Sequence, residues 1–385
     1  AIDTILEFCT LKQEGRIKAV IATGCLAERY RDEMKKEIPE LDAVVGIGSN
    51  GKICDIIREI LLDKQAVCSY GAKTELSMEG GRIISTEPFY AYIKIAEGCS
   101  NNCTYCAIPS IRGKYRSRRM EDIVKEARWL AENGVTELVV VAQDTTRYGE
   151  DIYGKSMLPE LLTALCEIDG FKWIRTLYCY PERITDELLD VIAKEDKLVK
   201  YLDMPIQHCD KTILKRMNRH GDRETLTALI KKIREKIPNV TLRTTLITGF
   251  PGETEEQFEE LCEFVKEIRF ERLGCFAYSP EEGTPAEKFE DQVPLKDRER
   301  RAEIIMEEQM IISDSLNEAA LDSEVEVVCE GFDRYAECYY GRSQADAPEI
   351  DGKIFFLSED KVRVGEYVKV KIDDTMDYDL IGSKM

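Results

Sequence analysis

The middle of the chain alternates short apolar runs with longer segments whose apolar residues recur every three to four positions. The runs are rich in β-branched residues, as in buried strands, and the segments between them have helical periodicity. Strands that alternate with helices predict a parallel sheet. Six such units predict an α/β fold with an open, partial parallel (β/α)6 barrel, whose chemistry belongs at the carboxyl ends of its strands. The expected strands are 90–96, 137–142, 173–178, 199–204, 241–248 and 272–278.

Local signals predict where several helices begin and end. Thr254 and Gln257 form a T-x-x-Q capping box before a helix that reaches Ile268. The segment 185–195 opens with a threonine and two acidic residues, which suit a helix start. The segment 120–132 ends at Asn133 and Gly134, a good stop signal.

Two smaller regions flank this barrel. Residues 1–86 begin with an expected helix, continue with two short strands that alternate with helices, and end in a polar linker, which predicts part of a small α/β domain. The chain starts at Ala1 inside the first helix, so we expect a truncated or processed chain. Residues 322–385 contain five short strands, one with period-2 alternation, and predict a small antiparallel β-barrel of a kind that binds a partner. The barrel domain is then 87–321.

Composition narrows the function classes. The formal net charge is −20 and the chain has two histidines, so a nucleic-acid binder and a histidine-rich metal site are disfavoured. Fourteen cysteines in a long chain with ample core indicate a reducing compartment with a few metal-binding thiols. No apolar run approaches the roughly 20 residues that cross a bilayer, so we expect no membrane partner.

Three cysteines stand close together after the first barrel strand. Cys99, Cys103 and Cys106 have the spacing C-x3-C-x2-C, with no histidine nearby and no paired fourth cysteine. Three thiolates can hold three irons of a [4Fe–4S] cube and leave the fourth iron open to a small molecule. A zinc site completed from elsewhere, or three cysteines without a shared role, are the alternatives.

The triplet, with Tyr105 before Cys106, resembles the radical S-adenosylmethionine (SAM) superfamily. Longer stretches, "EGCSNNCTYCAIPSIRGKYRSR", "TGCLAERY" and "TLITGFPGETEEQF", resemble its methylthiotransferase branch, whose chains end in a TRAM domain. The resemblance implies a [4Fe–4S] cluster, bound SAM, a cytoplasmic location and a low-potential donor such as flavodoxin or ferredoxin. The cluster would pass one electron to SAM and release a 5′-deoxyadenosyl radical.

The carboxyl-terminal region is similar to the RimO type of this branch, on "YYGRSQADAPEIDGKIFF" and "VKVKIDDTMDYDLIG". That type methylthiolates the β-carbon of an aspartate in small-subunit ribosomal protein number twelve. Residues 322–385 carry 16 acidic and 8 basic side chains, which suits a basic protein and repels RNA. A tRNA-modifying enzyme of the MiaB type is the first alternative, and a non-catalytic iron–sulfur or zinc interaction module is the second.

The resemblance also implies a second [4Fe–4S] cluster held by three cysteines of the first region. Cys25 matches the third of these ligands, and the other two would lie before Ala1. Cys9 shares an apolar helix face with Ile5 and is expected in the core instead. We therefore expect this chain to bind the second cluster poorly or not at all.

Other polar residues at expected strand ends are candidates for the cofactor site. Gln143 and Asp144 could receive the amino group or ribose of SAM, or cap a polar loop. Gln207 and His208 could line the pocket, and His208 could equally be a packed loop histidine. A basic run at 112–119 could hold an acidic group of the substrate or be a solvated loop. Chiefly by resemblance, Arg243, Gly249, Gly252 and Glu253 could bind SAM or only form a turn. Tyr105, next to Cys106, is a further candidate for binding the cofactor.

Overall fold

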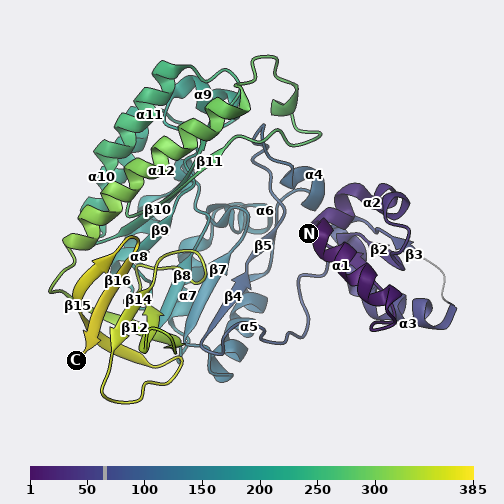
Figure 1. Cartoon of the computed structure of the whole chain (residues 1–385), viewed down its shortest axis with the longest axis horizontal. Helices are drawn as coiled ribbons and strands as arrows, with labels where there is room; N and C mark the ends of the chain where they lie inside the picture. Colours follow the sequence, from purple (N-terminus) through teal and green to yellow (C-terminus); the bar gives the residue numbers. More distant parts are fainter. Residues whose placement is uncertain (64–66) are drawn as a thin grey trace. The chain divides into compact units, whose positions relative to one another are not determined.

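The computed structural model describes residues 1–63 and 67–385, which divide into two compact units. The first unit contains Ala1–Arg82, Glu97–Asn102 and Cys106–Arg116, and the second contains Ile83–Ala96, Cys103–Tyr105 and Ser117–Met385. Figure 1 shows the course of the chain.

The first unit contains a three-stranded parallel sheet of order β1-β2-β3. Cys9 of α1 is 4% exposed and packs with Ile5, Val20 and Leu41, so its predicted core role is confirmed. The third strand was not predicted, because it lies directly before the polar linker and, unlike β2, has no fully buried residue. The elements are α1 (Ile2–Gln13), β1 (Ile21–Thr23), α2 (Cys25–Glu37), β2 (Ala43–Val45), η1 (Ile47–Lys52), α3 (Ile53–Asp63), β3 (Val67–Ser69), η2 (Lys73–Glu75) and α4 (Ile108–Arg112).

The second unit contains the six predicted parallel strands, as two sheets of order β4-β7-β8 and β11-β10-β9. A single parallel bridge between Ile174 and Leu198 lies between the two sheets. The predicted partial parallel barrel is therefore confirmed, with its ladder interrupted between β8 and β9. The strands are β4 (Tyr90–Lys94), β7 (Glu137–Val141), β8 (Trp173–Thr176), β9 (Tyr201–Asp203), β10 (Thr241–Thr248) and β11 (Arg272–Ala277). The short β5 (Ala96–Glu97) and β6 (Arg116–Ser117) form a separate two-stranded sheet.

Helices connect the strands, and their predicted caps are present. Thr254 and Gln257 form the capping box of α11, and the Thr185 side chain accepts from the Leu188 N–H at the start of α8. The long α12 lies along β10 and β11 (Figure 1). The helices are α5 (Met120–Glu132), α6 (Glu150–Tyr153), α7 (Leu158–Cys166), α8 (Asp186–Lys194), α9 (Lys211–Arg216), α10 (Arg223–Lys236), α11 (Glu255–Ile268) and α12 (Leu295–Glu318), with short 3-10 turns η3 (Thr145–Arg147), η4 (Pro181–Arg183) and η5 (Ala286–Lys288).

The carboxyl-terminal strands close into a five-stranded barrel of order β12-β13-β14-β16-β15. In β15, Val368, Val370 and Ile372 are buried while Lys369 and Lys371 are exposed, which confirms the predicted period-2 alternation. The antiparallel prediction holds except for one ladder, because β14 and β16 pair in parallel. The strands are β12 (Glu324–Asp333), β13 (Cys338–Arg342), β14 (Ile354–Leu357), β15 (Tyr367–Met376) and β16 (Asp379–Lys384).

This small barrel shares a core with the parallel strands. Val328 and Ala347 are buried in one cluster with Tyr90 and Trp173, and Tyr367 packs against it. Residues 342–351, which we call the TRAM loop, add polar contacts to the same strands. The loop is therefore an integral part of the second unit rather than a separate tether.

Four of the remaining cysteines are buried, namely Cys166, Cys179, Cys209 and Cys329. Burial raises the pKa of Cys179 to about 12 and of Cys166 to about 11, which keeps both thiols protonated. Cys54 and Cys68 are exposed instead, so an apolar packing role does not apply to them. Among residues 1–63 and 67–385, no helix combines the length and apolar character needed to cross a membrane.

Candidate active site at the carboxyl ends of the parallel strands

The backbone of the cysteine loop has tight steric requirements. Cys99 is 7% exposed, and its N–H donates to the Gly113 carbonyl at 3.1 Å. Gly98 has a φ of +76°, and a Cβ there would lie 2.4 Å from the Lys114 carbonyl oxygen. Only glycine fits such a close approach. The residue before Cys99 thus fixes how the loop leaves β5.

Cys103 lies among aromatic and cationic side chains of the second unit. Its Sγ is 3.4 Å from the Tyr180 hydroxyl, and the Arg219 guanidinium lies 4.1 Å from the centre of the Tyr180 ring. Burial raises the pKa of Tyr105 well above its usual value, and the nearby Cys103 adds to the shift. Tyr105 also packs against the cluster that contains Phe250. This surrounding excludes water on one side of the Cys103 sulfur.

The three cysteines have the donor chemistry of an iron–sulfur site. A [4Fe–4S] cube takes each thiolate on a different iron. The donor set of three soft sulfurs, two of them buried and one half-buried, fits iron–sulfur ligation.

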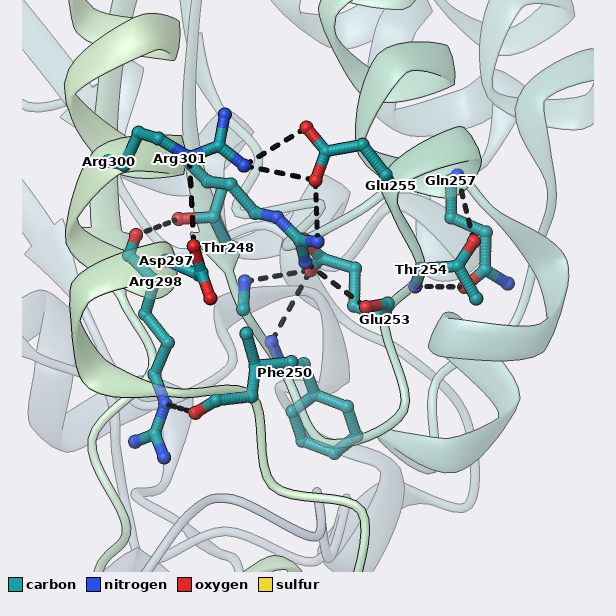
Figure 2. A network of polar contacts seen from close by, with 12 residues as sticks. Thr248, Phe250, Glu253, Thr254, Glu255, Gln257, Asp297, Arg298, Arg300 and Arg301 are labelled. Carbon is teal, nitrogen blue, oxygen red and sulfur yellow. Dashed lines mark hydrogen bonds and ion pairs between the residues drawn. The ribbon is translucent and has the colours of Figure 1, made fainter.

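Glu253 holds the loop after β10 from the inside (Figure 2). Its carboxylate accepts from the Gly249 N–H at 2.8 Å and the Phe250 N–H at 3.3 Å, and from Arg301 at 2.9 Å. The side chain is 4% exposed, and burial raises its pKa despite these donors. The structure therefore brings Gly249 and Glu253 together and places the carboxylate against backbone.

Arg298 of α12 completes this support. It donates to the carbonyls of Val293 and Tyr278, and a Cβ on Gly249 would lie 2.3 Å from its Cγ. Gly249 has a φ of +68°, so both its conformation and its surroundings exclude other residues. Sequence spacing gave no sign of Arg298 or Arg301, because they lie about 50 residues after the loop they hold.

Gln143 and Asp144 have different surroundings although they are adjacent. Within the described residues, the buried Oε1 of Gln143 has no hydrogen-bond partner. Asp144 is fully buried, accepts from the Thr146 hydroxyl at 2.5 Å and lies 3.7 Å from Arg147. An unsatisfied buried acceptor is rare in proteins and often marks a ligand position. The Gln143 side chain can therefore accept a hydrogen bond from a ligand, whereas Asp144 stabilises the conformation of its own loop.

Gln207 and His208 follow β9. Gln207 has a φ of +73°, and its buried Oε1 also has no protein partner in the described part of the chain. His208 is fully buried, and its Nδ1 accepts from the Asp210 N–H at 2.9 Å. Burial, with repulsion from Arg301, lowers the pKa of His208 to about 3. His208 is therefore neutral and buried, and among the described residues its Nε2 has no hydrogen-bond partner and lies 3.6 Å from Glu253. Whether it lines the pocket or only packs the loop stays a prediction.

Arg243 lies away from this edge, near the start of β10. Its guanidinium is 2.9 Å from Asp203 and 3.7 Å from Asp351 of the TRAM loop. A role for Arg243 in binding SAM stays a prediction, and the contacts described here are structural.

Cys25 and the basic run meet within the first unit. Arg112 donates to the Cys25 Sγ at 3.1 Å and to both Glu97 oxygens at 2.9 Å. Arg116 donates to the Lys73 carbonyl. In the second unit, Arg118 pairs with Glu126. These three arginines have protein partners, whereas Lys114 and Arg119 of the same run are exposed, so the solvated-loop interpretation still applies to part of the run.

Comparison with known protein families identifies two domains in the chain. Residues 93–265 match the model of the radical SAM superfamily, and residues 323–384 match that of the TRAM domain. The solved structure of a radical S-adenosylmethionine methyltransferase, TsrM from Kitasatospora setae, is 14% identical over 67% of this chain and 55% of its own, with a TM-score of 0.51. At that identity the likeness shows the fold alone.

Curated relatives are much more similar. The chain is 51% identical to "Ribosomal protein uS12 methylthiotransferase RimO" of Clostridioides difficile (strain 630), over 99% of this chain and 86% of the relative. It is 49% identical to the protein of the same name from Thermoanaerobacter sp. (strain X514), over 99% of this chain and 87% of the relative. The chain therefore belongs to the RimO family of radical SAM methylthiotransferases.

Proposed function

We propose that this chain replaces a hydrogen on the β-carbon of an aspartate in ribosomal protein uS12 with a methylthio group. The observation that carries the proposal is the similarity to RimO proteins over nearly the whole chain, including the cysteine triplet and the TRAM domain. The acidic carboxyl-terminal region supports a basic protein substrate. A ribosomal protein substrate would place the enzyme in the cytoplasm.

Cys99, Cys103 and Cys106 would hold the cluster, and the open iron would take SAM. When bound, the cluster supplies the electron that cleaves SAM to methionine and a 5′-deoxyadenosyl radical. The chain's own residues would orient the reactants and exclude water from the site. Tyr105 and Tyr180 cover the Cys103 sulfur, and the Oε1 atoms of Gln143 and Gln207 would accept from amino or hydroxyl groups of SAM.

The predicted roles of Asp144 and Glu253 are then indirect. Both carboxylates are buried and engaged with protein groups, so we propose that they shape the loops around SAM rather than contact it. Gly249 would let the backbone approach the adenine, since it has no side chain and a positive φ.

We propose no second [4Fe–4S] cluster on the residues of this chain alone, since Cys25 supplies one of the three thiolates that such a cluster would need. No step of the reaction is therefore assigned to Cys25 in this chain. Its 3.1 Å contact with Arg112 would still place a guanidinium against its sulfur.

The test is anaerobic reconstitution followed by two assays. Reduction with dithionite or a flavodoxin should release 5′-deoxyadenosine from SAM, and this result rejects a non-catalytic module. Incubation with purified uS12 should then give a mass increase of one methylthio group on a single aspartate. Modification or tighter, salt-sensitive binding of tRNA would instead favour the tRNA-modifying alternative.

A further inference from the structure

Tyr178 has a backbone conformation that is unfavourable for a tyrosine. It is the second residue after β8, at the carboxyl end of that strand, and its φ is +61°. A bulky side chain in this left-handed region is an outlier, because the Cβ atom crowds the backbone. Such a conformation persists only where the surrounding groups hold it in place.

Buried groups hold this conformation on both sides of the residue. The Tyr178 N–H donates to the Asp203 carboxylate at 2.9 Å. The Tyr178 carbonyl accepts from the Thr145 N–H at 3.0 Å and from the Thr145 hydroxyl at 3.1 Å. Asp203 and Thr145 are both buried, and all three residues belong to the second unit. The interior of that unit therefore fixes the backbone of Tyr178.

The conformation also changes the direction of the Tyr178 side chain. Successive residues of β8 alternate between two faces of the sheet. Ile174 and Thr176 share one face and are 1% and 6% exposed, and a regular strand would direct Tyr178 to the same face. Tyr178 is instead 47% exposed, although Leu177 and Cys179 on either side of it are buried. The left-handed residue thus brings an aromatic ring out of an otherwise buried segment.

Folding alone does not explain this arrangement. Burial of the tyrosine ring would stabilise the fold, since an aromatic side chain removes a large apolar surface from water. The chain leaves the ring half exposed and strains the backbone as well. Strained residues of this kind cluster at binding sites, where they keep a side chain in its binding position. The carboxyl ends of parallel strands are also where this fold carries its chemistry.

The other parallel sheet also has an exposed aromatic side chain near the carboxyl end of a strand. Phe276 of β11 is 62% exposed. The atom nearest to a Cβ built on Gly274 is a carbon of the Phe276 ring, at 3.8 Å. Large, partly exposed aromatic side chains are typical of surfaces that bind proteins. Both sheets therefore offer apolar contact area at this end, which favours a protein as the ligand.

We propose that the aromatic ring of Tyr178 packs against the segment of ribosomal protein uS12 that carries the target aspartate. The inference rests on the proposed function, because that function supplies the protein substrate. A tyrosine ring offers a large contact area and loses little conformational entropy on binding. A ring whose backbone is already fixed loses still less. The strained conformation thus weakens the fold slightly and strengthens substrate binding.

The test compares Tyr178→Phe, Tyr178→Ala and Tyr178→Gly with the wild-type enzyme. The matched control is Tyr335→Ala, which removes a fully exposed tyrosine between β12 and β13. Binding of purified uS12 is measured by titration of the reconstituted enzyme. SAM affinity and 5′-deoxyadenosine release are measured without uS12, and urea denaturation gives the unfolding midpoint of each variant.

Tyr178→Ala and Tyr178→Gly should each weaken uS12 binding on the order of tenfold, because both remove the ring. Tyr178→Phe keeps the ring, so it and the control should stay within about threefold of wild type. SAM affinity should stay within about twofold in every variant. Tyr178→Gly should unfold at a higher urea concentration than Tyr178→Ala, because glycine adopts a positive φ without strain.

Three results would overturn the inference. Unchanged uS12 binding in Tyr178→Ala would show that the ring does not contact the substrate. Weaker SAM binding in both ring-deleted variants would show that the ring serves the cofactor. A glycine variant less stable than the alanine variant would show that the backbone is not strained in solution. If the wild-type enzyme cleaves SAM but neither binds nor modifies uS12, the proposed function itself is wrong, and the inference fails with it.

Discussion

The two ends of the parallel strands satisfy their polar groups in different ways. At the amino ends, Arg342 and Arg175 share the buried carboxylate of Glu137, at 2.5 and 3.1 Å. At the carboxyl ends, in the part of the chain described here, the Oε1 atoms of Gln143 and Gln207 are buried acceptors without a protein partner. The buried atoms without a partner at the amino ends, in Arg175 and Arg272, are instead donors of guanidinium groups that are ion-paired through their other nitrogens. Tyr178 and Gln207 at this second end also have positive φ angles of 61° and 73°.

The contrast separates stability from function within one unit. Buried charges that are paired are costly to break, whereas unsatisfied acceptors and strained backbone persist where a ligand compensates for them. We therefore expect changes at the amino ends to alter folding first, and changes at the carboxyl ends to alter cofactor or substrate binding first.

The largest effect is expected at the cysteine loop. Cys103→Ala should abolish iron–sulfur absorption after reconstitution and 5′-deoxyadenosine release, because two thiolates hold the cube poorly. Circular dichroism should show an intact fold. Cys338→Ser, on the carboxyl-terminal barrel, is the control and should retain both signals. Full cluster content in Cys103→Ala would contradict the site.

Glu137→Gln tests the amino ends of the strands, where we expect a change in stability. It leaves the guanidinium groups of Arg175 and Arg342 buried without a carboxylate, at a cost of about 3–5 kcal/mol in the free energy of unfolding. Urea denaturation measures the change. Asp55→Asn, whose partner Arg58 is largely exposed, should leave stability nearly unchanged. A similar small change for Glu137→Gln would mean that the buried pair is not maintained in solution.

His208 predicts a pH dependence of stability. Its pKa is about 3 in the folded chain against an ordinary value of 6.5, so below that pH the unfolded chain binds a proton that the folded chain does not. Stability should fall by up to about 1.4 kcal/mol per pH unit between pH 6.5 and 3. Urea titrations at several pH values should give a smaller slope for His208→Gln. The exposed His220→Gln is the control, and equal slopes in both variants would refute the assignment.

The smallest effect is expected at Gln143. Gln143→Leu removes an acceptor that has no protein partner within the described residues, so the unfolding midpoint should stay the same or rise slightly. SAM affinity should fall by roughly fivefold, about 1 kcal/mol, measured by equilibrium binding. Gln292→Leu should behave oppositely, because Gln292 donates to the Ala286 and Phe289 carbonyls and stabilises the fold.

Local patterns predicted most of the fold. The six parallel strands, the capping box at Thr254 and the alternation in β15 depend on residues close in sequence, so the sequence shows them directly. The cysteine triplet was found for the same reason. The parallel pairing of β14 and β16 was not predicted, because the residues of one strand do not show whether its neighbour runs parallel or antiparallel to it.

The long-range ion pairs that hold the site in place could not be predicted from the sequence. Glu137 and Arg342 are 205 residues apart, and Glu253 and Arg301 are 48 apart, so neither pair leaves a local pattern. Arg243 shows the same limit, since a basic residue in a strand does not reveal whether a ligand or an aspartate of a distant loop faces it.

The TRAM loop occupies the amino ends of the parallel strands, where the Pro348 carbonyl accepts from Tyr92 and Asp346 pairs with Arg272. A protein substrate would therefore have to reach the radical chemistry from the carboxyl ends of the strands. A bound ribosomal protein would then cover this end of the strands. Methionine and 5′-deoxyadenosine could leave only after the ribosomal protein has dissociated. Turnover should accordingly slow when uS12 is in large excess.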